Sequence, residues 1–185
     1  MLAGVFLLGI SGFLWAQMNV VCTTGMVGDL VRQVGGDRVK VTTLMIEGVD
    51  PHLFKPTRDD VARILKADLV FYSGLHLEGR MEETFEKLSS KGKSITPVTS
   101  EIPEALLLKE GAVVDPHVWM NPALWASCTK TVSDSLGKKD PEGAAIYAAN
   151  ATRYATQLQS LETTLRSLIA TIPDDQRVLI TAHDA

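Results

Sequence analysis

From residue 19 onward, short runs of apolar and β-branched residues alternate with segments whose apolar positions recur every three or four residues. This alternation is typical of βα units and of a mainly parallel sheet. The runs predict strands at residues 20–24, 39–44, 69–72 and 94–98. The amphipathic segments predict helices at residues 26–34, from Thr57 onward and at 81–88. Residues 101–114 show no pattern that favours either kind of element.

The C-terminal half of the chain is predicted to be almost entirely helical. A helix after Asn121 and Pro122 places its apolar residues on one face, namely Leu124, Trp125, Cys128, Val132 and Leu136. Asp140 followed by Pro141 indicates the start of another helix, which continues to about Ala170 and is ended by Pro173. A helix of roughly 30 residues would be about 45 Å long at 1.5 Å per residue. This is more than a small domain needs, so we expect the helix to connect two lobes.

These elements divide the chain into four parts. We expect a signal-like apolar segment at residues 1–18, an N-terminal α/β lobe at 19–139, a long linking helix at 140–172 and the start of a second lobe at 173–185. The fold class is therefore α/β, with a parallel sheet in the first lobe and only the first strand of a second α/β lobe. The sequence stops directly after an apolar run at residues 178–180. We therefore expect the second lobe to be truncated.

The N-terminal segment carries no charged residue before Asp29. Residues 1–16 resemble the apolar core of a secretory signal, although the usual basic start is missing. An uncleaved anchor and a buried helix are alternatives, but the apolar block is shorter than the roughly 20 residues that cross a bilayer. We therefore predict export to the periplasm or the cell surface.

Charge and cysteine content narrow the choice of partners. The net charge of −4 and the lack of a basic run argue against a nucleic-acid partner, because neutralising phosphates needs clustered Lys and Arg. Cys22 and Cys128 both lie within apolar patterns, which predicts two buried thiols rather than a disulfide. Residues 19–21 also lack the small side chains that normally precede a lipid-attachment cysteine.

Three of the four histidines occupy similar positions. His52 and His117 each end an Asp-Pro-His tripeptide, and His183 follows a predicted strand. In open parallel sheets ligands bind at the carboxyl ends of strands, where these imidazoles should converge. The prolines stiffen both loops, and the neighbouring acids, Asp50, Asp115 and Asp184, could fix the loops or the imidazole tautomers. The residues alone leave a metal site and a purely structural motif equally open.

Six short segments together resemble a known family. They lie at residues 20–26, 48–52, 67–70, 74–78, 115–119 and 178–184, and the three histidines are 65 and 66 residues apart. In order and spacing the sequence is similar to the TroA-like solute-binding proteins of ABC importers for zinc and manganese. This resemblance implies that His52, His117 and His183 ligate the metal directly. It also implies two α/β lobes joined by one long helix, a fourth, carboxylate ligand beyond Ala185, and delivery of the ion to an ABC permease.

The resemblance also implies that the protein is not an enzyme, and we expect a monomer. A zinc hydrolase with a three-histidine site is the rival interpretation, but no His-Glu-x-x-His helix or other general base accompanies the ligands. A third interpretation is a surface adhesin. Imidazole nitrogens favour zinc over manganese in raw affinity. Residues 101–114 lack the histidine-rich loop of some zinc-dedicated relatives, so both ions remain candidates.

Nearby residues are assigned supporting roles. We expect His76 to lie on the surface or behind the ligands, because three imidazoles and one carboxylate already complete a tetrahedral site. Glu78 is expected to be a solvated acid in a loop or at a helix start. Trp119 and Trp125 are expected to be core aromatics near the mouth of the site.

Overall fold

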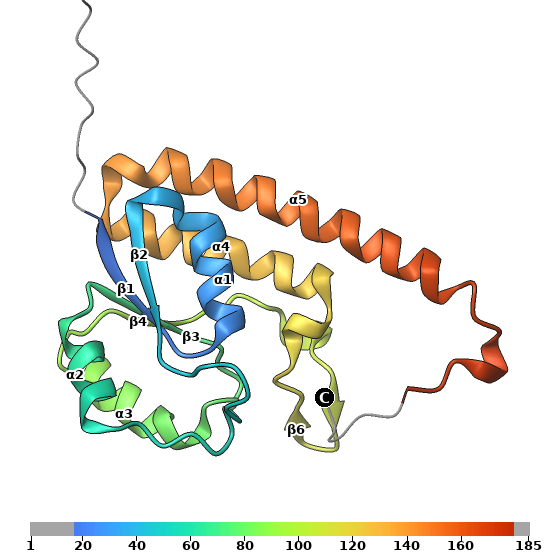
Figure 1. The fold of residues 1–185 in the computed structure, drawn as a ribbon, viewed down its shortest axis with the longest axis horizontal. Coiled ribbons are helices and arrows are strands. Elements are labelled where there is room, and N and C mark those ends of the chain that lie inside the picture. Colours follow the sequence, from blue (N-terminus) through green and yellow to red (C-terminus); the bar gives the residue numbers. More distant parts are fainter. Residues whose placement is uncertain (1–16, 180–185) are drawn as a thin grey trace, which may run out of the picture.

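The computed structural model describes residues 17–179, so His183 and most of the signal-like segment lie outside it. Four parallel strands form one sheet in the order β2-β1-β3-β4 (Figure 1). The strands are β1 (Met18–Cys22), β2 (Val39–Thr43), β3 (Leu69–Tyr72) and β4 (Ile95–Pro97). All four strands predicted between residues 20 and 98 are present, with their ends shifted by two residues at most. The predicted α/β class with a parallel sheet is confirmed.

The helices cover both faces of this sheet. They are α1 (Gly25–Gly35), α2 (Arg58–Lys66), α3 (Gly79–Ser89), α4 (Pro122–Lys139) and α5 (Ala144–Ile169). Figure 1 shows α2 and α3 on one side of the sheet and α1, α4 and α5 on the other. The region without a predicted element contains a short 3-10 turn (Glu104–Leu106) and a small antiparallel hairpin of β5 (Lys109–Glu110) and β6 (Val113–Val114).

Strand side chains point alternately into two hydrophobic cores, one on each face. Val20 and Cys22 belong to the core under α1, α4 and α5, whereas Val21 and Val70 pack with Ile64 and its neighbours under α2 and α3. Since both faces are covered, the strands read as continuous apolar runs. Cys22 and Cys128 are free and buried, and burial raises the pKa of each thiol to about 12. The prediction of two buried thiols is confirmed.

Local sequence signals account for where the helices begin and end. The Thr57 hydroxyl accepts a hydrogen bond from the Asp60 N–H, and the Asp60 carboxylate accepts one from the Thr57 N–H, which completes a capping box at the start of α2. The Asn121 side chain accepts from two N–H groups in the first turn of α4. Helix α1 ends at Gly36, whose φ of 55° is a conformation that glycine adopts without strain.

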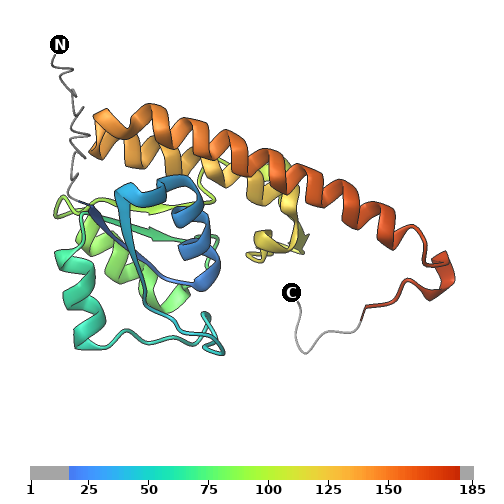
Figure 2. The ribbon, with the colours of Figure 1, turned by 45° about the horizontal axis from the view of Figure 1, so that its top comes forward.

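Helix α5 is the predicted long helix, with 26 residues after a short 3-10 turn at Pro141–Gly143. The part of α5 up to Leu158 packs on α1 and α4 through the buried side chains of Tyr147, Ala151 and Leu158. The second half of α5 extends beyond the α/β body, as Figure 2 shows, and exposes Leu161, Leu165, Leu168 and Ile169. Residues 177–179 form no strand, and the rest of the strand predicted after Arg177 lies outside the described residues.

None of the helices within residues 17–179 combines the length and the apolar character needed to cross a bilayer.

Candidate metal centre

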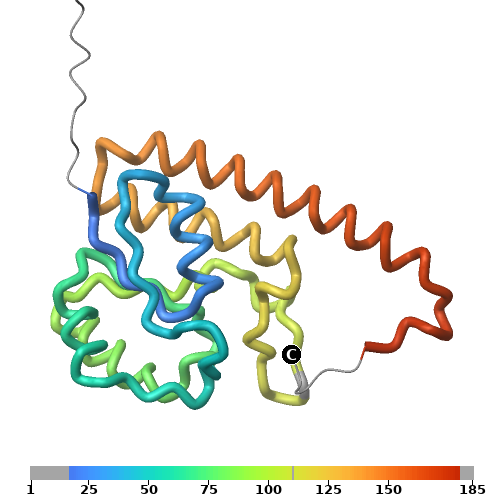
Figure 3. Tube along the Cα trace, in the orientation of Figure 1, coloured from blue at the N-terminus to red at the C-terminus, as the bar shows by residue number. Residues whose placement is uncertain are grey.

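The sheet has a topological switch point between β1 and β3. From β1 the chain moves to β2 on one side, and from β3 it moves to β4 on the other. In open α/β sheets, ligands bind in the crevice outside the carboxyl ends of the strands at such a point. The Cα trace in Figure 3 shows the loop between β2 and α2 and the segment leading to α4 approaching this same end of the sheet.

His52 and His117 meet at this edge. Their Nε2 atoms lie 3.3 Å apart, and the two rings are tilted by 64° with centroids 5.3 Å apart. Two imidazole nitrogens at zinc–nitrogen distances of about 2.0–2.1 Å on a tetrahedral ion are separated by about 3.3 Å. The spacing of these two nitrogens therefore fits two ligands of one metal ion.

Both histidines are held by the same backbone device. The Asp50 carboxylate accepts a hydrogen bond from the N–H of His52 at 2.8 Å, and Asp115 accepts one from the N–H of His117 at 2.9 Å. An acidic side chain that bonds its own backbone two residues on makes a compact turn, and the proline between the two residues restricts it further. The repeated Asp-Pro-His tripeptide thus forms two equivalent stiff turns.

The His117 imidazole has an additional partner. Its Nδ1 lies 2.7 Å from the Asp115 carboxylate oxygen, and its side chain is only 8% exposed. Burial raises the pKa of Asp115, but the hydrogen bonds from the His117 N–H and ring outweigh burial and hold the pKa below its ordinary value. A carboxylate that accepts from Nδ1 favours the tautomer whose Nε2 lone pair can bind a metal.

Aromatic and apolar side chains surround the pair on the side of α4. The Trp119 ring contacts His117 edge to face, with centroids 5.2 Å apart, and Trp125 is buried in the core. Beside His117 lies a depression of about 250 Å³, lined by Asp115, His117, Asn121 and mostly apolar neighbours, including Leu106 and Leu108. The prediction of a position near the site is confirmed for Trp119, and the prediction of a core position is confirmed for Trp125.

The third predicted ligand, His183, lies outside the described residues and stays a prediction. Among residues 17–179, no group of three or more His, Cys, Asp or Glu side chains is placed to hold a metal ion. The described part of the chain therefore contributes the His52–His117 pair to the predicted ligand set.

His76 lies at the surface. Its side chain is 86% exposed, and its Nδ1 is 2.7 Å from the Glu82 carboxylate. The prediction of a surface position is confirmed. Its role as a non-ligand is not tested by this geometry.

Glu78 lies at the start of α3, as predicted, but the prediction that it is solvated is wrong. Its side chain is buried, with 1% of the residue exposed, rather than solvated. The carboxylate accepts hydrogen bonds from the Thr23 hydroxyl at 2.6 Å and from the N–H groups of Ser73 and Gly74 at 2.8 and 3.2 Å. Burial raises the pKa of Glu78 despite these hydrogen bonds, which lower it. An acid at a helix start is usually solvated, and nothing in the hydropathy pattern shows that the preceding loop turns this one inward.

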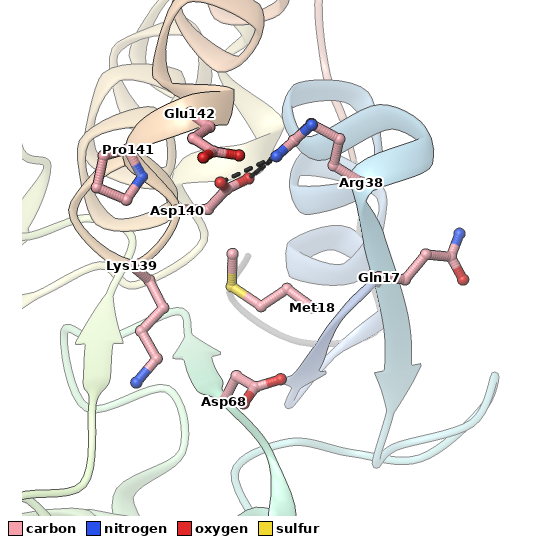
Figure 4. A pocket seen from close by; sticks show the side chains of 8 residues that line it. All are labelled: Gln17, Met18, Arg38, Asp68, Lys139, Asp140, Pro141 and Glu142. Carbon is pink, nitrogen blue, oxygen red and sulfur yellow. Dashed lines mark hydrogen bonds and ion pairs between the residues drawn. The ribbon is translucent and has the colours of Figure 1, made fainter. Parts of the chain in front are cut away.

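A second cavity, of about 610 Å³, lies at the opposite edge of the sheet, beside the start of β1 and the end of α4 (Figure 4). Its charged side chains are of both signs, and Arg38 and Asp140 are ion-paired across 2.7 Å. It is lined by Gln17, Met18, Arg38, Asp68, Lys139, Asp140, Pro141 and Glu142, none of which is a histidine or a cysteine. Of these two places, it is the carboxyl ends of the strands that bring two histidines together.

Comparison with known proteins places these features in a family. Residues 20–185 match the family described as "ZnuA: Zinc-uptake complex component A periplasmic". The manganese-binding lipoprotein MntA of Bacillus subtilis is 42% identical over 171 residues, which cover 91% of this chain and 56% of that protein. The zinc-binding protein TroA of Treponema pallidum is 40% identical over 90% of this chain and 54% of its own length.

Solved structures show the same similarity. The periplasmic zinc-binding protein TroA from Treponema pallidum superposes with a TM-score of 0.87 and 38% identity, over 92% of this chain and 61% of that one. The Zn(II)-bound AdcA of Streptococcus pneumoniae gives a TM-score of 0.73 and 30% identity, over 80% of this chain and 32% of that one. The chain spans about half the length of the curated relatives it matches.

Proposed function

Because the chain belongs to the family of periplasmic zinc-uptake components, we propose that the protein captures a divalent transition metal, zinc or manganese, and delivers it to an ABC permease. The observation that carries the proposal is the His52–His117 pair, whose two Nε2 atoms face each other at the spacing of two ligands of one ion. Both imidazoles lie at the switch point of the sheet, where this architecture binds ligands.

The proposed ligand set extends beyond this pair. His183 is the third ligand, and a carboxylate from a second lobe is the fourth. Three imidazoles and one carboxylate make a closed tetrahedral site, which suits binding and release of an ion rather than activation of a water molecule. We therefore propose no catalytic activity.

Different observations support zinc and manganese as the bound ion. Raw affinity of nitrogen ligands favours zinc over manganese, whereas geometry and supply can reverse that preference. One similar protein is named for manganese and another for zinc, so similarity supports both ions. The relatives are also named as periplasmic or lipoprotein components, which supports the proposed location outside the cytoplasm.

The proposed organisation follows the same argument. Residues 19–139 form the metal-binding lobe, residues 140–172 form the linking helix, and residues from 173 begin a second lobe that closes over the ion. The apolar side chains exposed on the second half of α5, among them Leu161 and Leu165, support the packing of that second lobe there. We propose that the protein acts as a monomer whose macromolecular partner is the permease.

Isothermal titration of the full-length protein with Zn²⁺ and with Mn²⁺ tests the proposal. The wild type should bind one equivalent of one or both ions, and the substitutions His52→Ala and His117→Ala should each abolish or severely weaken this binding. His76→Ala is the matched control, because it removes the same side chain from an exposed position and should leave the affinity unchanged.

Two results would overturn the proposal. Unchanged affinity in both the His52→Ala and the His117→Ala protein would show that the pair is not the site. Metal-dependent esterase or peptidase turnover that His117→Ala removes would favour the hydrolase instead.

A further inference from the structure

Four buried polar residues form a cluster at the carboxyl ends of the strands, at the switch point between β1 and β3. Thr23 follows β1, Ser73 follows β3, Thr99 lies just beyond β4, and Glu78 comes from the loop before α3. Each of the four has 3% or less of its surface exposed. The cluster therefore fills the place where an open α/β sheet would otherwise form a crevice.

Glu78 is the centre of this cluster. Its Oε1 accepts hydrogen bonds from the Thr23 hydroxyl and the Ser73 N–H, and its Oε2 accepts one from the Gly74 N–H. One side chain thus joins the ends of two neighbouring strands. Burying a carboxylate costs free energy, which its hydrogen bonds must offset. The burial of Glu78 therefore calls for a structural or functional explanation.

The loop that brings Glu78 to this position is strained. Three consecutive residues, Gly74, Leu75 and His76, have φ values of 91°, 54° and 64°. Non-glycine residues in this region are strained and persist only where their surroundings hold them. The hydrogen bonds of Glu78 to the backbone at residues 73 and 74 supply that restraint, and strain of this kind clusters at functional sites.

The strand ends joined by Glu78 also carry the two segments that bear histidines. The carbonyl of Thr23 accepts from the N–H of Met45, where the loop that bears His52 begins. The carbonyl of Ser73 accepts from the Thr99 hydroxyl at 2.7 Å and from the Thr99 N–H at 3.4 Å, at the start of the segment that leads to His117. Continuous hydrogen bonds therefore run from Glu78 to the roots of both segments.

We propose that Glu78 is a positioning residue of the metal centre, which fixes the relative placement of His52 and His117 by clamping the strand ends from which their loops start. This inference rests on the proposed function, since it assigns Glu78 to the same site. It does not make Glu78 a ligand, because the carboxylate is buried and occupied by its three hydrogen bonds.

The test is Glu78→Gln in the full-length protein. The glutamine keeps the size but replaces one acceptor oxygen with an NH₂ group that faces a backbone or hydroxyl donor. We expect Zn²⁺ affinity to fall roughly tenfold, the lower end of what outer partners of metal ligands contribute. With Co²⁺ as the probe, the visible d–d spectrum of the loaded protein should change, since it reports the arrangement of the ligands.

Two further variants keep the experiment interpretable. Thr23→Val removes only the hydroxyl that donates to Glu78 and should shift both readouts in the same direction by a smaller amount, even if Glu78→Gln does not fold. Asp140→Asn removes the ion pair with Arg38 at the amino ends of the strands, far from the histidines in the sheet. It should lower stability while leaving Zn²⁺ affinity and the Co²⁺ spectrum unchanged.

The outcomes separate this inference from the proposed function. Loss of binding in His117→Ala with wild-type affinity and spectrum in Glu78→Gln or in Thr23→Val would overturn the role of Glu78 alone. Equal effects of Glu78→Gln and Asp140→Asn would show a general loss of stability and would also overturn it. A wild-type protein that binds no Zn²⁺ or Mn²⁺ would overturn both proposals.

Discussion

The two Asp-Pro-His tripeptides share a backbone turn but hold their imidazoles differently. Asp50 accepts a hydrogen bond from the backbone N–H of His52, whereas Asp115 accepts from the backbone N–H of His117 and also lies against its ring Nδ1. At His52, the hydrogen bond orients the loop. At His117, it orients the loop and the ring together, so Asp115 fixes more of its histidine than Asp50 does.

This difference predicts unequal effects of two matched substitutions. Asp50→Ala and Asp115→Ala each remove one turn-forming acid, but only Asp115→Ala also removes the acceptor at Nδ1. We expect Asp115→Ala to weaken Zn²⁺ binding by roughly 10- to 100-fold and Asp50→Ala to weaken it less. Calorimetric titration of both variants measures the contrast. Equal losses would mean that the ring contact contributes nothing beyond the turn.

The sequence alone could single out the histidines as candidate ligands, but it could not predict all of their surroundings. His52 and His117 were recognisable because each ends the same tripeptide, and a repeated short motif is visible without coordinates. Glu78 was assigned to solvent, because a carboxyl group near a helix start is normally exposed. Its burial depends on three successive left-handed residues, of which only Gly74 signals such a conformation in the sequence.

At the scale of elements, α1 and β2 pack with almost no space between them. A Cβ added at Gly35, the last residue of α1, would lie within 2.7 Å of Val39 Cγ1 at the start of β2. Real side-chain carbons do not approach this closely, so either the helix or the strand would have to move. The site depends on this packing indirectly, because β2 leads into the loop that bears His52.

We therefore expect Gly35→Ala to lower the free energy of unfolding by about 1–3 kcal/mol, the usual cost of overpacking. Urea denaturation followed by circular dichroism measures it. The matched control is Gly25→Ala in the first turn of the same helix, where an added Cβ meets nothing within 4 Å. A loss of the same size in both variants would contradict the steric explanation and point to helix propensity or backbone effects.

The regular elements were predictable because their signals are local and repeated. Strands of a covered parallel sheet read as apolar runs, and helices α2 and α4 begin directly after Thr57 and Asn121, whose side chains cap them. The hairpin of β5 and β6 was not predicted, because each of its strands has two residues and too few positions to show a period. Such a pairing is decided by tertiary contacts rather than by local pattern.

At the scale of the whole molecule, one polar network fastens the long helix to the sheet. The Asp140 carboxylate, between α4 and α5, accepts two hydrogen bonds from the Arg38 guanidinium and one from the Tyr147 hydroxyl at 2.6 Å. Arg38 directly precedes β2, and Tyr147 is fully buried in α5. A single acid therefore joins the start of β2, α4 and α5; Figure 4 shows its pairing with Arg38.

Asp140→Asn should lower the free energy of unfolding at pH 7 by roughly 1.5–3 kcal/mol, the range for hydrogen bonds to a charged group. Burial raises the pKa of Asp140, but the hydrogen bonds from Tyr147, Arg38 and Gly143 outweigh it and hold the pKa below the ordinary value of 3.8. A carboxyl group whose pKa is lower in the folded state stabilises the protein above its unfolded pKa. That stabilisation is lost as the pH falls through the folded pKa, which here means below about pH 4.

The difference in stability between the wild type and Asp140→Asn should therefore be constant near neutral pH and shrink below about pH 4, where the wild-type carboxyl group becomes protonated. Urea unfolding of both proteins at pH 7, 5 and 3 tests this. Asp134→Asn, which breaks an exposed ion pair with Lys130, should change stability little at pH 7. A difference that stayed constant down to pH 3 would mean that Asp140 acts through shape alone. Its ion pair would then not be what fastens α5 to the sheet.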